Sequence, residues 1–130
     1  MSDGNRVFVV DDDASARKGL TRLLSAAGYE VQAFSSGEKL LTALGSDEYG
    51  CLVLDARMPG ISGNELQERL AEHHVQCPVI FVTADDNPET RKKAQKMKAV
   101  AFFRKPVDGT ALLDTVAWAL DSANRALGSQ

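Results

Sequence analysis

Five short apolar runs alternate along the chain with five segments whose apolar residues recur at helical spacing. Runs of Val, Ile, Leu and Phe are typical of strands buried on both faces, as in a parallel sheet. The second run instead alternates apolar with polar residues, which indicates an edge strand. This alternation of strands and helices favours an α/β fold with right-handed crossovers. The predicted strands are Val7–Val10, Val31–Phe34, Leu52–Leu54, Val79–Val82 and Val100–Phe103.

The helical segments between these strands have recognisable ends. Gly28 follows the first pattern as a stop, and Ser35 or Ser36 can cap the second helix. Asn87-Pro88 is a start signal for the fourth, with Asn as cap and Pro in the first turn. The predicted apolar stripes are Ala16, Leu20, Leu23, Leu24 and Ala27; Leu40, Leu41 and Leu44; Leu66 and Leu70; and Leu113, Val116, Ala117 and Leu120.

Length, charge and hydropathy limit the classes of protein to which this chain can belong. The 130 residues suit one domain, which we expect over residues 1–123, with 124–130 as a tail or the start of a linker. A net charge of -3 argues against direct nucleic-acid binding or attachment to a membrane surface. No apolar stretch approaches the roughly 20 residues of a membrane span, and the N-terminus lacks the apolar core of a signal peptide. Cys51 and Cys77 form no Cys-x-x-Cys motif, so we expect a reduced, cytoplasmic chain.

Reactive side chains follow four of the five predicted strands. Asp11 and Asp12 follow the first strand, and Asp55 follows the third. Thr83 follows the fourth, and Lys105 follows the fifth. In an open parallel sheet, ligand sites lie beyond the carboxyl ends of the strands. We therefore expect these side chains to gather at one edge of the sheet.

This combination of side chains suits phosphoryl chemistry. Two carboxylates about 4 Å apart repel by roughly 4 kcal/mol at an effective dielectric near 20, so the acids need a cation such as Mg2+. Asp12 and Asp55 can hold the ion, with Asp11 acting through water. Asp55 can also serve as a nucleophile toward phosphorus. Thr83 and Lys105 can then bind the remaining phosphoryl oxygens.

Four motifs together carry a family resemblance. They are Val-Asp-Asp-Asp at residues 10–13, Asp55-x-x-Met-Pro with Gly63 after it, Thr83-Ala84, and Phe102 three residues before Lys105-Pro106. With them, the sequence resembles the receiver domain of two-component response regulators from Val7 to about Ser122. The resemblance implies a flavodoxin-like three-layer sandwich, in which five helices flank a five-stranded parallel sheet of order 2-1-3-4-5.

The resemblance also implies a phosphorylation-activated signalling switch and not an enzyme acting on external substrates. Asp55 would take a phosphoryl group from the phosphohistidine of a sensor histidine kinase. Mg2+ would be bound by Asp12, Asp55 and the backbone carbonyl of Arg57. The domain would catalyse only this transfer and its own dephosphorylation. Its output would be a change in the surface of the fourth helix, fifth strand and fifth helix, which controls a downstream partner or effector domain.

Further roles follow from the same resemblance. Thr83 and Phe102 match the family's switch pair, and Lys105-Pro106 matches a peptide bond that is cis in the family. Arg57 and Asp85 flank the site and are candidate modulators of phosphoryl lifetime. Lys98 is a departure, because the family usually has glycine there and Lys adopts a left-handed conformation only at a cost. We therefore expect an altered end of the fourth helix.

Two surface features have alternative interpretations. Trp118 points away from the predicted apolar stripe of the fifth helix, so it either covers neighbouring methylenes or contacts a partner. The fourth helix carries a run of basic residues, Arg91, Lys92, Lys93, Lys96 and Lys98. That run is either a solvated face or a contact surface for an acidic partner or a second copy. A homodimer would then use the fourth helix, fifth strand and fifth helix.

A different class of protein also fits the first acidic motif. In a haloacid-dehalogenase-type phosphatase, Asp11 would be the nucleophile and Asp13 the acid/base, with Thr83 and Lys105 as later motifs. That class predicts an acidic pair on a strand after the lysine, and no strand pattern follows Lys105. It also leaves Asp55-x-x-Met-Pro unexplained. A flavin-binding module is disfavoured because it would bind phosphate at the loop between the first strand and the first helix, and that loop is acidic here.

Overall fold

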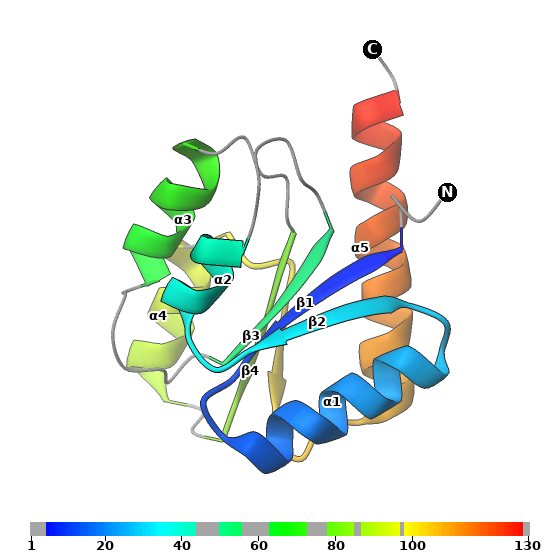
Figure 1. Cartoon of the computed structure of the whole chain (residues 1–130). Helices are drawn as coiled ribbons and strands as arrows, with labels where there is room; N and C mark the ends of the chain where they lie inside the picture. The colour runs from blue at the N-terminus through cyan, green and yellow to red at the C-terminus, as the bar shows by residue number, and fades with distance from the viewer. Residues whose placement is uncertain are drawn as a thin grey trace.

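The computed structural model describes residues 5–43, 50–55, 63–72, 78–84, 87–96 and 98–128, with side chains as far as Asp121 in the last range. Its five strands form one parallel sheet of order β2-β1-β3-β4-β5, as the resemblance implied (Figure 1). Edge strand β2 has no buried residue, whereas β3 and β4 are buried throughout, as their sequences predicted. The strands are β1 (Arg6–Val10), β2 (Glu30–Phe34), β3 (Cys51–Asp55), β4 (Val79–Thr83) and β5 (Ala101–Arg104).

The helices cover both faces of the sheet. Figure 1 shows α1 and α5 on one side and α2, α3 and α4 on the other. Alternate residues of each inner strand therefore enter different apolar layers: Val7 and Val9 pack beneath α1 and α5, and Phe8 and Val10 beneath α2–α4. This is the predicted three-layer sandwich. The helices are α1 (Ala14–Ala26), α2 (Gly37–Ala43), α3 (Gly63–Glu72), α4 (Pro88–Lys96) and α5 (Gly109–Gly128).

The buried face of α5 differs from the predicted stripe. Ala117 is exposed, whereas Leu112 and Ala119 are buried together with Val116 and Leu120. The buried positions are spaced i, i+4, i+7 and i+8, which is a continuous helical stripe rotated from the one we predicted. The helix also continues to Gly128, past the domain end expected at residue 123, which stays a prediction.

Smaller differences occur at element ends. The sequence predicts Ala27 in the apolar stripe of α1, but this residue is exposed and caps the helix. The sequence predicts Val100 in the fifth strand, but this residue precedes β5 and is 40% exposed. Cys51 is buried in β3, whereas Cys77 and Leu44 lie outside the described residues. Among the helices that the structure describes, none is long and apolar enough to cross a membrane.

The ends of α1 and α4 are built alike. At the end of α1, the Gly28 N–H donates to the Ser25 carbonyl (3.0 Å) and the Tyr29 N–H to that of Leu24 (3.2 Å). Both bonds belong to the Schellman motif, in which the residue after the helix is left-handed. Gly28 has the φ of 99° that this motif requires.

The same two bonds close α4, from the Lys98 N–H to the Gln95 carbonyl and from the Ala99 N–H to that of Ala94, both 3.0 Å. Here the left-handed residue is Lys98, with φ of 54°. We expected Lys98 to alter this helix end. Instead, the motif is kept and Lys98 adopts the left-handed conformation itself.

Candidate functional site

Strand register brings the predicted acids together. Val10 on β1 pairs with Leu54 on β3, so the next residue of each segment, Asp11 or Asp55, lies at the same carboxyl edge of the sheet. One carboxylate oxygen from each of Asp11, Asp12 and Asp55 lies within 4.8 Å of the other two. Asp11 and Asp55 are buried, whereas Asp12 is exposed. The structure thus forms the acidic cluster that the sequence predicted.

Lys105 partly neutralises this cluster. Its Nζ donates to Asp11 Oδ2 at 2.7 Å and lies 3.6 Å from Asp55 Oδ2. Burial by itself would lower the pKa of the Lys105 ammonium, but the hydrogen bond with Asp11 and the charges of both acids outweigh that effect and raise the pKa. The side chain is therefore a cation shared by two carboxylates. The Lys105–Pro106 peptide bond is cis, as the resemblance implied.

Both carboxylate oxygens, the backbone N–H and the backbone carbonyl of Asp11 all form hydrogen bonds. Its Oδ1 accepts from the Asp13 N–H (2.9 Å), and its own N–H donates to the Phe34 carbonyl (3.1 Å). Its carbonyl accepts from Arg17 Nη1 at 2.7 Å. Since both carboxylate oxygens already accept hydrogen bonds, Asp11 suits an indirect, water-mediated contact with an ion. Arg17 was not among the predicted site residues; the signal for it in the sequence is a long cationic side chain in the first turn of the helix after the acidic loop.

Asp13 has a structural role at the start of α1. Its side chain accepts from the Ala16 N–H at 2.8 Å and caps the helix. The alternative phosphatase interpretation requires this carboxylate as an acid/base. It also requires a strand after Lys105, but in the part of the chain that the structure describes, the element after Lys105 is α5. Both observations count against that alternative.

The remaining predicted residues lie on the strands and helix next to the cluster. Thr83 is fully buried at the end of β4, and Lys105 follows the residue paired with it on β5. Phe102 is half-buried on β5, on the side of the sheet covered by α2–α4. Trp118 on α5 is 57% exposed. Arg57 and Asp85 lie outside the described residues.

Comparison with known families decides between the two interpretations. The family model described as the response regulator receiver domain matches residues 7–117. The chain belongs to the response regulator receiver family. This receiver is therefore a domain of a two-component signalling system, and its family consists of signalling switches and not of classical enzymes. Nothing in the comparisons supports the phosphatase alternative.

Curated relatives are similar in sequence to this receiver over most of its length. It is 43% identical over 110 residues to nodulation protein W of Bradyrhizobium diazoefficiens, covering 85% of this chain and 48% of that protein. It is 33% identical over 130 residues to transcriptional regulatory protein FixJ of the same organism, covering all of this chain and 63% of FixJ. The receiver thus spans about half to two-thirds of the length of these relatives.

Solved structures show the same fold. The response regulator StyR matches with a TM-score of 0.81 at 40% identity, covering 95% of this chain and 63% of StyR. Full-length FixJ from B. japonicum matches with a TM-score of 0.83 at 34% identity, covering 96% of this chain and 62% of FixJ.

The acidic cluster has the donor chemistry that Mg2+ prefers. Receiver domains bind Mg2+ at acidic residues. Asp12 and Asp55 offer carboxylate oxygens, one from an exposed and one from a buried side chain, and Mg2+ combines such ligands with retained waters. The residues present therefore fit the ion.

Proposed function

We propose that this receiver accepts a phosphoryl group on Asp55 from the phosphohistidine of a sensor histidine kinase. A carboxylate oxygen of Asp55 forms the new P–O bond as the P–N bond to the kinase imidazole breaks, and the imidazole nitrogen keeps the electron pair. The observation that carries the proposal is that Asp55 ends β3 beside two further carboxylates and 3.6 Å from the Lys105 ammonium. Phosphoryl transfer needs mainly such positioning and charge neutralisation.

The residues around Asp55 would have separate roles in binding Mg2+ and the phosphoryl group. Asp12, Asp55 and the carbonyl of Arg57 would hold Mg2+, with Asp11 acting through water, and the bound ion would neutralise phosphoryl oxygens. Lys105 binds a phosphoryl oxygen through its ammonium while Asp11 keeps it oriented. The Thr83 hydroxyl donates to another phosphoryl oxygen.

The output follows from the added charge. A phosphoryl group brings about -1.5 to -2 charges, which attract the Thr83 hydroxyl and the Lys105 ammonium. Movement of Thr83 toward Asp55 vacates space that the Phe102 ring fills by rotating inward. The surface of α4, β5 and α5 changes as a result, and a downstream effector domain or partner, or a second copy of the receiver, reads this change.

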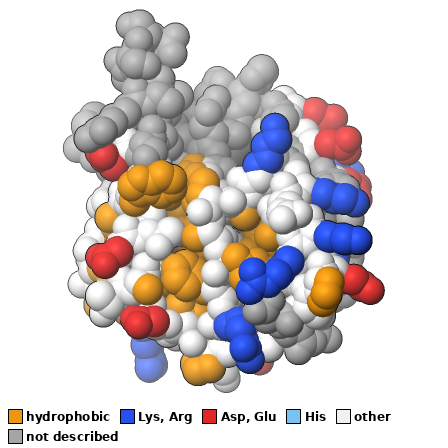
Figure 2. All heavy atoms as spheres, turned by 180° about the vertical axis from the view of Figure 1, so that it is seen from behind, with side chains coloured by type: hydrophobic (Ala, Val, Ile, Leu, Met, Phe, Trp, Pro, Cys, Tyr) orange, Lys and Arg blue, Asp and Glu red, His pale blue; other side chains and the backbone are white. Residues whose placement is uncertain are grey.

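The face that includes this surface has features that suit a partner. Seen from behind, hydrophobic side chains gather across its middle, and Lys and Arg side chains lie mainly on the side of α4 (Figure 2). Among the residues whose side chains the structure describes, the large hydrophobic ones that are exposed are Val100 and Trp118. We propose Trp118 as a partner contact, because tryptophan is enriched at protein interfaces.

Two finer properties belong to the same proposal. The receiver would also hydrolyse its own phosphoryl group, at a rate set partly by Arg57 and Asp85. It would act in the cytoplasm, where it would meet the catalytic domain of the kinase. Substitution of Asp85 by Ala should change the decay rate of the phosphorylated receiver while leaving the extent of phosphorylation intact.

Intact-mass measurement tests the central step. Incubation with acetyl phosphate and Mg2+ should add one phosphoryl group, and Asp55→Asn should abolish the addition. Asp114→Asn, on the exposed face of α5, is the matched control and should be phosphorylated like the wild type. Labelling that survives Asp55→Asn and disappears in Asp11→Asn would support the phosphatase alternative instead.

A further inference from the structure

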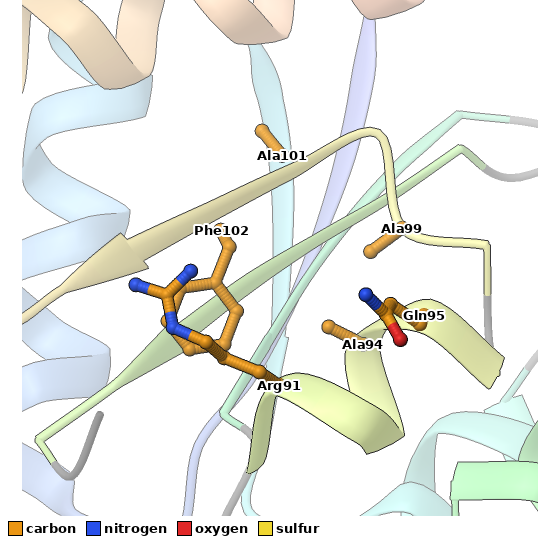
Figure 3. A pocket seen from close by; sticks show the side chains of 6 residues that line it. All are labelled: Arg91, Ala94, Gln95, Ala99, Ala101 and Phe102. Atoms are coloured by element: carbon orange, nitrogen blue, oxygen red, sulfur yellow. The ribbon is translucent and has the colours of Figure 1, made fainter. Parts of the chain in front are cut away.

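A cationic side chain of α4 lies on the aromatic ring that matches the family's switch position. The guanidinium carbon of Arg91 lies over the Phe102 ring, 4.9 Å from its centroid (Figure 3). This distance is within the range of a cation–π interaction. The contact joins α4 to β5, two of the three elements that form the proposed output surface.

Apolar packing encloses the Phe102 ring only in part. One side packs against the apolar core beneath α2–α4. The ring also lines a cavity of about 210 Å3, whose other lining residues are Arg91, Ala94, Gln95, Ala99 and Ala101. Three of these are alanines, which leave the space beside the ring open (Figure 3). Close packing does not fix the ring on that side. A single contact with Arg91 can therefore shift the equilibrium between ring positions appreciably.

The backbone that carries Arg91 is itself fixed. At the start of α4, the Thr90 N–H donates to Asn87 Oδ1 at 2.9 Å, and at its end the Schellman bonds hold Lys98 and Ala99. Thr90 and Ala94 are buried on either side of Arg91 along the helix. Because the helix backbone is fixed, Arg91 can follow an inward rotation of the ring only by changing its own side-chain conformation.

We propose that Arg91 is a positioning residue of the switch, whose guanidinium holds the Phe102 ring in its present, half-buried position and so opposes the inward movement that accompanies phosphorylation. This inference rests on the proposed function. A cation–π contact at an exposed site corresponds to about a two- to fivefold change in the equilibrium between the two ring positions. Because ring position and phosphoryl binding are linked, removal of the contact should raise the affinity for a phosphoryl mimic by the same factor.

Calorimetric titration of the full chain with beryllofluoride in excess Mg2+ tests this directly. Arg91→Met should lower the dissociation constant of the mimic about two- to fivefold. Lys93→Met is the matched control, because it removes the same charge from an exposed position of α4. Lys93→Met should bind as the wild type does, and Arg91→Lys, which keeps a cation over the ring, should recover most of the wild-type value.

Measurements in the Phe102→Leu variant distinguish the contact between Arg91 and the Phe102 ring from a general effect of removing a charge from α4. There, Arg91→Met should no longer change the affinity, because the ring on which the guanidinium lies is gone. Unchanged affinity in Arg91→Met alone, an equal gain in Lys93→Met, or a gain that persists with Leu at 102 would each overturn the role of Arg91. Failure of the wild-type chain to bind the mimic, or equal binding by Asp55→Asn, would instead overturn the proposed function and this inference with it.

Discussion

The left-handed residue at the end of α4 leads to a quantitative stability prediction. Lys98 has φ of 54° in the same hydrogen-bonded motif that Gly28 completes in α1 with φ of 99°. A left-handed conformation costs a residue with a Cβ roughly 1–2 kcal/mol, which glycine avoids. We therefore expect Lys98→Gly to stabilise the folded receiver.

The magnitude is smaller than this cost because glycine also stabilises the unfolded chain. That entropic term is about 0.4–1 kcal/mol. The free energy of unfolding should consequently rise by about 0.5–1 kcal/mol in Lys98→Gly. For a chain of this length, this increase corresponds to a rise in melting temperature of roughly 2–4 °C.

Two further variants isolate the backbone effect. Lys98→Ala removes the charge but keeps the Cβ, so it should leave the stability within about 0.5 kcal/mol of the wild type. Gly28→Ala is the reciprocal change: a Cβ at this position would have no atom within 4 Å, so the cost of about 0.5–1 kcal/mol would come from the backbone alone.

Urea unfolding followed by circular dichroism measures all three differences, with slopes that should match the wild type. A Lys98→Gly variant that is no more stable than Lys98→Ala would refute a backbone cost at this position. A neutral Gly28→Ala would likewise show that the positive φ carries no cost in this motif.

Three other variants test the acidic site and the switch. Lys105→Met should lower the free energy of unfolding by about 2–4 kcal/mol in metal-free buffer, since it leaves the fully buried Asp11 carboxylate without its cation; an unchanged denaturation midpoint would contradict this. Asp12→Ala should weaken Mg2+ binding in a calorimetric titration while raising metal-free stability by less than about 1 kcal/mol, because Asp12 is exposed. Thr83→Ala should still be phosphorylated, but the fluorescence change of Trp118 on binding of a phosphoryl mimic should be blunted; a full response would exclude Thr83 from the switch.

Local patterns accounted for most of the fold. Valine-rich runs and a mixed polar run predicted the inner strands and the edge strand β2, because burial on two faces or one face determines which residues a strand tolerates. Gly28 and Asn87-Pro88 predicted helix ends from their backbone preferences. The order of the strands followed from the family resemblance, which added what periodicity leaves open.

The buried face of α5 required the tertiary structure. Ala117 and Ala119 have the same side chain, and only the angle at which the helix packs on the sheet determines that Ala119 is buried. Leu112 and Leu113 present the same problem, since an apolar residue at the margin of a stripe can lie on either side of it.

The sequence by itself determined which reactive side chains reach the carboxyl edge of the sheet, because the ends of parallel strands meet there. It did not determine how they pair. Lys105 bonds to Asp11 across 94 residues, Asp13 caps α1, and Arg91 covers Phe102. Contacts of this kind depend on distances between elements that are remote in the chain, and only their packing in three dimensions establishes those distances.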